Sequence, residues 1–589
     1  MTCLLLKQLN NWMQSLGEVM QNVSEILELN YLQQTISDFL VRHSPEEDKE
    51  PIRLLGDALT ERTLKYGSHL SVDEVKGLLG DLDTSTLSVI GDEEGMEPIV
   101  RREDGALYLR RYFVYEQRIA LAISRRCNAE LQPLADSSQQ FFQESLRPNM
   151  DPGQQIAAAL AVHRDFTILS GGPGTGKTRT IVGVLAWLLH INPELNISLA
   201  APTGKAAFRM RESILDSCTE FNFSDKLQAL IREAAQPSTI HRLLGSIPNS
   251  VNFRHNAERP LATEYLIVDE SSMVDLPLMA KLMDALQEDS RILLVGDPNQ
   301  LSPVQGGDVF NSVAREFSPA SVSSAEVDLM NNVGVESSSL SLSGDNLAGM
   351  HMSLSRVHRQ EGAKVDIPML CQLVKSGNAD EFIQLLRQYS GNEGSPVQWT
   401  EGYGQDSVSE AIKTGFLPLG KATNSSQALE AMSQFRILCA NNDGKYGVES
   451  WNDSAASMIS DQAVASPIVV TTNDYSVGLF NGDDGVLIEN RAWFRGESGT
   501  WDLARSRLPT FLPSYAITIH RSQGSEFDNV VIVLPPQSQV LTRELLYVAI
   551  SRAKSGFLIV GSEDAIRSAL DNVSPTTSGV PHFLRSADQ

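Results

Sequence analysis

The fold of this chain is decided by one stretch, Gly171-Gly172-Pro173-Gly174-Thr175-Gly176-Lys177-Thr178. An apolar run at residues 166–170 precedes it, and a helix-forming run at residues 180–189 follows it. Strand, glycine-rich loop and helix in this order are typical of a phosphate-binding loop, whose glycines let backbone N–H groups turn towards phosphate oxygens. In such a loop, Lys177 reaches the β- and γ-phosphates of ATP and the Thr178 hydroxyl ligates Mg²⁺. The stretch therefore predicts an α/β domain that binds ATP and Mg²⁺.

Length and composition indicate a multidomain globular protein. A chain of 589 residues is too long to fold around one hydrophobic core, and its length suggests roughly three to five domains. No apolar run approaches membrane-spanning length, so we expect a cytoplasmic location and no membrane contact. The net charge of -25 disfavours a protein that coats DNA and leaves room for an enzyme with a local basic channel. Widely spaced cysteines without a C-x-x-C pair indicate reduced thiols rather than a zinc or iron–sulfur site.

Short apolar runs alternate with helical segments through much of the chain. A first series lies at residues 166–170, 197–200, 265–268 and 291–295, and a second at 435–439, 516–519, 530–534 and 557–560. Such alternation predicts parallel sheets flanked by helices. We therefore expect two α/β domains, at residues 141–350 and 351–589, after a helical N-terminal domain at residues 1–140.

Three shorter segments depart from this pattern. Residues 318–343 are rich in serine and lack Lys and Arg, which predicts a flexible insertion in the first domain. Residues 465–510 hold short strand-like runs with Gly-Asp turns, so we expect a small β-barrel inserted into the second domain. Residues 415–422 repeat the glycine and lysine spacing of a phosphate loop, but they contain Pro418 and end in Ala422. We expect no second nucleotide site there.

Two further strand ends carry polar side chains at a plausible distance from the loop. Asp269 and Glu270 follow an apolar strand, where Asp269 can hold Mg²⁺ through water and Glu270 can orient or deprotonate the attacking water. Taken alone, either carboxylate would more often cap the next helix. Behind a phosphate loop, we expect the catalytic role. Gln300 follows the strand at 291–295 and can sense the γ-phosphate, although a proline-rich turn would be the favoured explanation of this segment taken alone.

Taken in order, these segments resemble the motifs of superfamily 1 helicases. The other matching segments are residues 201–207, 354–359, 518–527 and 547–553. The resemblance implies two RecA-like motor domains, with Arg359 and Arg552 of the second reaching the γ-phosphate as arginine fingers. A lone arginine is more often a surface residue or an ion-pair partner, and that alternative stays open for both. The resemblance also implies that Gln154 reads adenine, with its neighbour Gln155 as the alternative.

The same resemblance implies where the ribose and the DNA lie. Gly524 and Glu526 belong to a motif whose glutamate meets the nucleotide. The candidates for contact with the DNA backbone are Thr203, His241, Thr518 and His520. For the two histidines, a structural role is as reasonable as DNA contact. A small pin-like insertion after Ala206 and an SH3-like barrel at about 465–510 would complete the strand channel.

Within this superfamily, the sequence is similar to the RecD family, the alpha subunit of exodeoxyribonuclease V in the 5′-to-3′ branch. The similarity rests on residues 107–118, 170–178, 239–244, 296–305, 439–452, 473–475, 478–483 and 543–547. It implies an ATP-dependent 5′-to-3′ DNA helicase that joins RecB-like and RecC-like subunits in a heterotrimer and processes double-strand DNA ends for recombinational repair. The nuclease would then belong to a partner subunit, and residues 1–140 would dock the partners.

Three other functions fit parts of the pattern. The chain could work as a stand-alone RecD-like or phage Dda-like 5′-to-3′ helicase, or as a DNA-stimulated ATPase that does not unwind. The third is a structural subunit with a degenerate motor. The intact residues that argue against the third are Lys177, Asp269, Glu270, Gln300 and Arg552.

Overall fold

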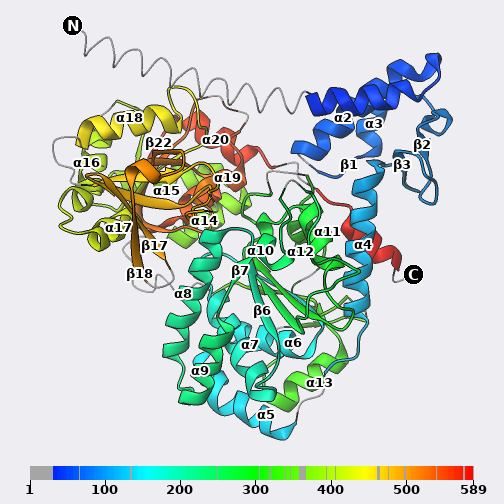
Figure 1. The fold of residues 1–589 in the computed structure, drawn as a ribbon, viewed down its shortest axis with the longest axis horizontal. Coiled ribbons are helices and arrows are strands. Elements are labelled where there is room, and N and C mark those ends of the chain that lie inside the picture. Colours follow the sequence, from blue (N-terminus) through cyan, green and yellow to red (C-terminus); the bar gives the residue numbers. More distant parts are fainter. Residues whose placement is uncertain are drawn as a thin grey trace.

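The computed structural model of this chain is organised around two parallel sheets, with an antiparallel sheet beside the second and a small mixed sheet near the N-terminus (Figure 1). The structure describes residues 31–587 apart from 66, 133–134, 249, 304–305, 318, 320, 338–339, 345–346, 357–366, 393, 405, 460–464, 475, 497–498, 537, 539 and 575–576. Within these residues, no helix is both long and apolar enough to cross a membrane.

The first parallel sheet carries the glycine-rich loop. Its six strands lie in the order β12-β5-β9-β8-β6-β7. They are β5 (Phe166–Gly171), β6 (Ile197–Ala201), β7 (Ser238–Thr239), β8 (Tyr265–Val268), β9 (Arg291–Gly296) and β12 (His351–Leu354). The register pairs Ser170 with Gly296 and Val268 with Leu294, so the carboxyl ends of β5, β8 and β9 share one edge. Loops at such an edge form the ligand site of α/β domains.

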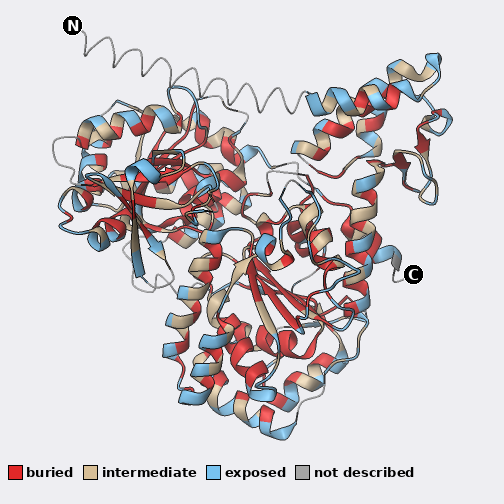
Figure 2. Cartoon of the chain, in the orientation of Figure 1, coloured by how far each residue is buried: buried red, intermediate tan, exposed pale blue. Residues whose placement is uncertain are grey.

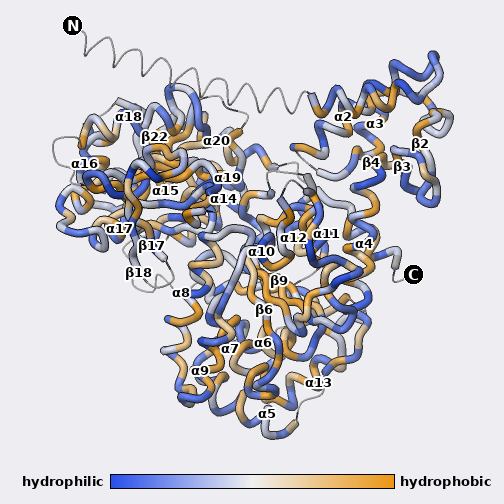
Figure 3. The backbone as a smooth tube through the Cα atoms, in the orientation of Figure 1, coloured by the Kyte–Doolittle hydropathy of each residue, from blue (hydrophilic) through white to orange (hydrophobic). Residues whose placement is uncertain are grey.

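Helices cover both faces of this sheet, which explains why its central strands are largely apolar. They are α5 (Asp136–Phe141), α6 (Pro152–His163), α7 (Lys177–Ile191), α8 (Gly204–Glu220), α9 (Asp225–Ala234), α10 (Ile240–Leu244), α11 (Leu276–Asp284) and α12 (Val309–Glu316). On one face, α6 and α7 pack around the fully buried Trp187. On the other, Ile168 and Leu294 meet α11 and α12. Figures 2 and 3 show these central strands as both buried and hydrophobic.

The second parallel sheet has five strands in the order β13-β22-β21-β14-β20. They are β13 (Val397–Thr400), β14 (Phe435–Cys439), β20 (Ala516–Thr518), β21 (Phe527–Val533) and β22 (Ala553–Val560). Its helices are α14 (Ile367–Ser376), α15 (Ala379–Ser390), α16 (Asp406–Gly420), α17 (Ser425–Gln434), α18 (Val448–Ile459), α19 (Arg543–Ser551) and α20 (Glu563–Asp571). The prediction of an α/β fold is confirmed. The loop-like repeat at residues 415–422 falls largely within α16, where it forms no phosphate loop.

An antiparallel sheet is inserted in the sequence between α18 and β20. Its strands, in the order β18-β17-β16-β15-β19, are β15 (Ala465–Val470), β16 (Asp484–Ile488), β17 (Arg491–Gly496), β18 (Gly499–Ala504) and β19 (Phe511–Pro513). The sheet has its own small core, which includes Ile468, Val470 and Phe494. The strands lie where the sequence predicts them, and their closure into a barrel stays a prediction.

The N-terminal part is mixed rather than helical. Its helices are α2 (Lys49–Lys65), α3 (Val72–Leu79) and α4 (Arg110–Cys127), and four short strands form a sheet in the order β1-β4-β3-β2. These strands are β1 (His69–Leu70), β2 (Ile90–Gly91), β3 (Ile99–Arg101) and β4 (Leu107–Leu109). The expectation of a helical domain overlooked a hairpin, because Gly105 takes the left-handed φ of 90° in the turn that joins β3 to β4.

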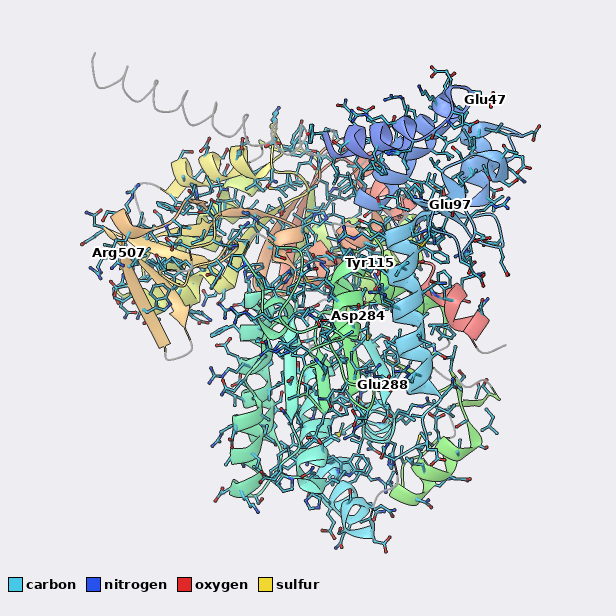
Figure 4. All side chains as sticks on the ribbon, turned by 45° about the vertical axis from the view of Figure 1, so that its right-hand side comes forward. Glu47, Glu97, Tyr115, Asp284, Glu288 and Arg507 are labelled. Atoms are coloured by element: carbon cyan, nitrogen blue, oxygen red, sulfur yellow. The ribbon has the colours of Figure 1, made fainter. Side chains whose placement is uncertain are left out.

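Helix α4 joins this N-terminal part to the first parallel sheet. Arg118 of α4 pairs with Asp284 of α11 at 3.1 Å, and Arg125 pairs with Glu288 at 2.6 Å. Figure 4 shows Asp284 and Glu288 beside this helix. The C-terminal helix α21 (Val580–Ala587) packs on α4 too, with the rings of Phe113 and Phe583 edge to face at 5.2 Å.

The serine-rich segment contains a folded helix, so the expectation of a flexible insertion is wrong for that part. Helix α13 (Ser324–Val333) starts with a capping box between Ser323 and Glu326. The Glu326 carboxylate is fully buried and pairs with Arg164, and Met330 is buried in the same core as α6. Serine-rich composition concealed a Ser-x-x-Glu helix start and an apolar face. Two short strands, β10 (Ser321–Val322) and β11 (Ser341–Leu342), flank the helix.

The pin-like insertion expected after Ala206 is absent at that position. Helix α8 runs without interruption from Gly204 to Glu220. Its buried side chains include Met210 and Ile214, whose spacing of four keeps one face of the helix on the core. A continuous amphipathic helix leaves no room for an inserted pin there.

Candidate nucleotide site

The glycine-rich loop adopts the conformation that a phosphate cradle needs. Gly174 and Gly176 have φ values of 75° and 84°, in the left-handed region that favours glycine. Helix α7 begins at Lys177, so its free N-terminal N–H groups face the loop. The Lys177 ammonium group donates to the carbonyl oxygens of Gly171 at 2.6 Å and Gly172 at 3.2 Å. Thr178 follows in the first turn of α7, half-buried.

The two predicted carboxylates follow β8 at the same sheet edge. Glu270 has a φ of 51°, which costs a residue with a side chain about 1 kcal/mol or more and is typical of functional sites. Burial raises the pKa of Asp269. Burial, and next the neighbouring Asp269 carboxylate, raise the pKa of Glu270 to about 7, while the charges of Lys177 and Arg552 oppose the rise. A carboxylate with such a pKa can accept a proton from water near neutral pH.

The strand end after β9 supplies Asp297 and Gln300. Gln300 is 3% exposed, and among the described residues its Oε1 atom has no hydrogen-bond partner. A buried amide oxygen without a partner is costly and points to a ligand or water that satisfies it. Asp297 is fully buried and accepts a hydrogen bond of 2.6 Å from the Tyr547 hydroxyl of α19. The first sheet is therefore bonded to the second at this edge.

Arg552 comes directly after α19 and is buried, so it is no surface arginine. Its guanidinium donates to the carbonyl oxygens of Ser525 at 3.0 Å and Val548 at 3.2 Å. Its charge is close enough to oppose the pKa rise of Glu270. The structure thus brings Arg552 towards the carboxylates of the first sheet. Arg359, the other predicted finger, lies outside the described residues.

A cleft of about 370 Å³ lies between the two sheets. The residues that line it include Gly172, Thr175, Asn299, Cys371, Lys375 and Tyr547. They come from the phosphate loop, from the segment after β9, and from α14 and α19 of the second sheet. Residues of both parallel-sheet domains therefore line the cleft, as is required if a bound nucleotide is to move one domain relative to the other.

The structure distinguishes Gln154 from Gln155. Gln154 forms a capping box with Asp151 at the start of α6, and its side-chain amide donates to the Thr175 carbonyl of the phosphate loop at 3.4 Å. The Gln155 amide instead donates to Met150 at 2.8 Å, away from the loop. Position favours Gln154 as the residue near the nucleotide, and its contact with adenine stays a prediction.

Gly524 and Glu526 lie against α8 and do not line the cleft. A methyl group built on Gly524 would lie 3.6 Å from Ala206, and the Arg209 guanidinium donates to the Glu526 carbonyl at 3.5 Å. Ser525, which stands between them, accepts a hydrogen bond of 3.0 Å from Arg552, and the predicted contact of Gly524 and Glu526 with the nucleotide stays a prediction.

The four DNA candidates lie at strand and helix ends of both sheets. The Thr203 hydroxyl caps α8 by accepting a hydrogen bond of 3.2 Å from the Ala206 backbone N–H. The Thr518 hydroxyl accepts a hydrogen bond of 3.1 Å from the Arg521 backbone N–H. His241 is exposed and His520 is half-buried, and desolvation lowers the pKa of both. Each threonine hydroxyl already has a structural role, which leaves DNA contact as an additional one.

Comparisons with known proteins agree with this geometry. An AAA domain family model matches residues 154–306, and a UvrD-like helicase C-terminal domain model matches residues 513–560. The RecBCD enzyme subunit RecD of Mycolicibacterium smegmatis is 32% identical over 523 residues, which cover 84% of this chain and 85% of that protein. The chain belongs to the RecD family. The Haemophilus influenzae RecD subunit is 31% identical, over 82% of this chain and 80% of that protein.

As a RecD-family member, the chain is an ATP-dependent DNA helicase of the RecBCD type. Among solved structures, Bacteroides Pif1 bound to single-stranded DNA aligns with 74% of this chain and 94% of its own. That distant likeness has 17% identity and a TM-score of 0.36.

Sequence reasoning missed three groups of this RecD-family site. Lys375 and Cys371 lie in the cleft, although α14 belongs to none of the helicase motifs. Tyr547 stands in a recognised motif but had no assigned role. Lys205 pairs with Asp484 of the antiparallel sheet, an ion pair between segments far apart in the sequence. Tyr547 and Lys205 both stand in recognised motif segments, at residues 547–553 and 201–207, whereas Lys375 and Cys371 had no local signal.

Proposed function

We propose that this RecD-family chain is the 5′-to-3′ motor subunit of a heterotrimer with RecB-like and RecC-like partners, which processes double-strand DNA ends for recombinational repair. The observation that carries the motor part is the cleft in which the phosphate loop faces Tyr547 and the neighbourhood of Arg552. Cleavage of ATP in a cleft between two domains can change their separation, because each domain supplies part of the site.

In the proposed hydrolysis, each polar group of the site has one role. Lys177 binds the β- and γ-phosphates, and Glu270 takes the proton of the attacking water. The Gln300 amide, with its unsatisfied oxygen, orients that water or senses the γ-phosphate. Arg552 stabilises the charge that develops on the transferred phosphoryl group, as Arg359 would from its own segment.

The site also fits Mg²⁺. Asp269 and Glu270 are half-buried oxygen donors whose pKa values are raised by desolvation, and a cation would offset that cost. Asp269 and the Thr178 hydroxyl would hold the ion. Once bound, Mg²⁺ would neutralise phosphate charge.

The proposed DNA path runs over the ends of α8, α10 and β20, past Thr203, His241, Thr518 and His520. The segment between β15 and β16 borders the same surface, because the Arg242 guanidinium of α10 lies 4.7 Å from the ring centroid of Phe480. Closure of the antiparallel sheet into an SH3-like barrel would complete the channel. Exposed aromatic and basic groups are what single-stranded DNA binds. ATP would close the cleft, and hydrolysis would reopen it, so that the two grips move alternately.

The N-terminal part is the proposed docking module. It presents exposed apolar side chains, among them Phe39 at 54%, Leu82 at 43% and Met96 at 90%. Exposed apolar side chains of this size are available for contact with a partner protein. The nuclease would belong to a partner, and the cytoplasm is the proposed location.

Two experiments test this proposal. Affinity purification of the tagged chain should recover large RecB-like and RecC-like subunits, and recovery of the chain alone would favour a stand-alone helicase. Strand displacement on duplexes with a 5′ or a 3′ single-stranded tail should require the 5′ tail. Displacement only from 3′ tails would refute the polarity, and ATP turnover without displacement by the chain and its complex would leave a DNA-stimulated ATPase.

A further inference from the structure

One lysine of the second sheet lies in the nucleotide cleft and has no part in the roles given above. Lys375 belongs to α14 and lines the same cleft as Gly172 of the phosphate loop. A methyl group built on the Cα atom of Gly172 would lie 3.6 Å from the Lys375 ammonium nitrogen. The side chain therefore reaches from the second sheet to the loop that follows β5.

The ammonium group of Lys375 rests on an aromatic ring. Its nitrogen lies 4.8 Å from the ring centroid of Tyr547, a cation–π contact that positions the charge without neutralising it. The Asp297 carboxylate lies near this ring and accepts a hydrogen bond of 2.6 Å from the Tyr547 hydroxyl. Among the ion pairs of the described residues, none includes Lys375. A partly buried cation of this kind attracts an anion strongly.

Two lysines from opposite sheets thus meet at Gly172. The Lys177 ammonium group donates to the Gly172 carbonyl at 3.2 Å. Because the lysine of a phosphate loop reaches the β- and γ-phosphates, Gly172 lies on the γ-phosphate side of the loop. An anion placed there would be bound by Lys177 from the first sheet and by Lys375 from the second.

We propose that Lys375 binds the γ-phosphate of ATP from the second motor domain and so distinguishes ATP from ADP; this inference rests on the proposed nucleotide site. ADP lacks the group that Lys375 would contact, whereas Lys177 would still hold the β-phosphate. Closure of the cleft therefore depends on the third phosphate. Lys375 acts in addition to Arg552, from a helix outside the helicase motifs.

The test compares two nucleotides on four proteins. Equilibrium binding of Mg²⁺ complexes of ADP and of the non-hydrolysable analogue AMP-PNP is measured for wild type, Lys375→Ala, Lys375→Arg and the control Lys413→Ala. Lys413 is an exposed lysine of α16, far from the motifs in sequence. Loss of one charged hydrogen bond should weaken AMP-PNP binding of Lys375→Ala about 10-fold and leave ADP binding within about 2-fold. Lys375→Arg should retain most of the AMP-PNP affinity, and Lys413→Ala should match wild type.

The outcomes separate this inference from the proposed site. If wild type binds neither nucleotide, the nucleotide site itself is wrong. If wild type binds both and Lys375→Ala loses affinity for both equally, or for neither, the γ-phosphate contact is wrong and the site stands. Thermal unfolding of each variant checks the fold, which alanine in a helix should preserve.

Discussion

The Tyr547 hydroxyl donates a hydrogen bond of 2.6 Å to Oδ2 of Asp297, which lies 250 positions away in the chain. Tyr547 belongs to α19 beside the second sheet, whereas Asp297 directly follows β9 of the first. Burial, and then the Asp297 carboxylate, raise the pKa of Tyr547, so the hydroxyl keeps the proton that it donates. This bond joins the two sheets at the nucleotide cleft, which Tyr547 lines.

Tyr547→Phe should uncouple the sheets while preserving the ring under Lys375. Removing a hydrogen bond to a carboxylate should lower kcat/KM for DNA-stimulated ATP hydrolysis about 10-fold, and the melting temperature should fall because the fully buried Asp297 loses a donor. Tyr403→Phe is the matched control, because the Tyr403 hydroxyl donates to the Leu534 carbonyl at 2.7 Å within the second domain. Equal losses in both variants would contradict a special role for the bond across the cleft.

Lys177→Gln should abolish ATP turnover without unfolding the protein. The glutamine keeps a polar side chain at the start of α7 but removes the positive charge that binds the phosphates, so kcat should fall on the order of 100-fold or more. Lys421→Gln, in the loop-like repeat, makes the same change at an exposed position and should turn over like wild type. Wild-type turnover in Lys177→Gln would overturn the assignment of the site.

Glu270→Gln should separate binding from hydrolysis. The neutral amide cannot accept the proton of water, so single-turnover hydrolysis should slow about 10²- to 10⁴-fold while ATP still binds. Asp269 raises the pKa of Glu270 by like-charge repulsion, and the substitution removes that repulsion. The melting temperature should therefore stay equal or rise. A lower melting temperature, or unchanged hydrolysis, would show that Glu270 supports the fold rather than the reaction.

Acid should destabilise the N-terminal part through His69. Burial, then the charges of Arg102 and Arg62, lower the pKa of His69 to about 4, against weaker opposition from Asp104 and Glu74. Between the two pKa values, a histidine with a lowered folded pKa binds its proton mainly in the unfolded chain. Its contribution to stability is therefore fully present above about pH 6.5 and is lost as the pH falls towards about 4.

His69→Phe tests this acid effect because phenylalanine keeps a ring against Tyr108, which His69 stacks on at 4.8 Å, and cannot be protonated. Its melting temperature should fall less than that of wild type between pH 6.5 and pH 5, the window set by the histidine shift. Part of the pH dependence should remain, since burial also lowers the pKa of His163 to about 4. Identical pH profiles for the two proteins would rule His69 out.

Local patterns were enough to predict which side chains share one edge of the first sheet. The glycines of the loop, Asp269, Glu270 and Gln300 each follow a short apolar strand, and parallel strands bring such positions together. Local patterns gave the wrong structure in two segments. The serine-rich segment conceals the capping box of Ser323 and Glu326, and the N-terminal hairpin depends on one turn at Gly105.

The sequence by itself determined the phosphate loop, the parallel sheets and the family, because backbone sterics and strand spacing are read within a few residues. The tertiary structure alone decided which groups face the loop from the second sheet. Lys375 and Tyr547 reach Gly172 and Asp297 only after two separately folded sheets have met. No local pattern encodes a contact over such a separation, since it depends on the packing of every element between.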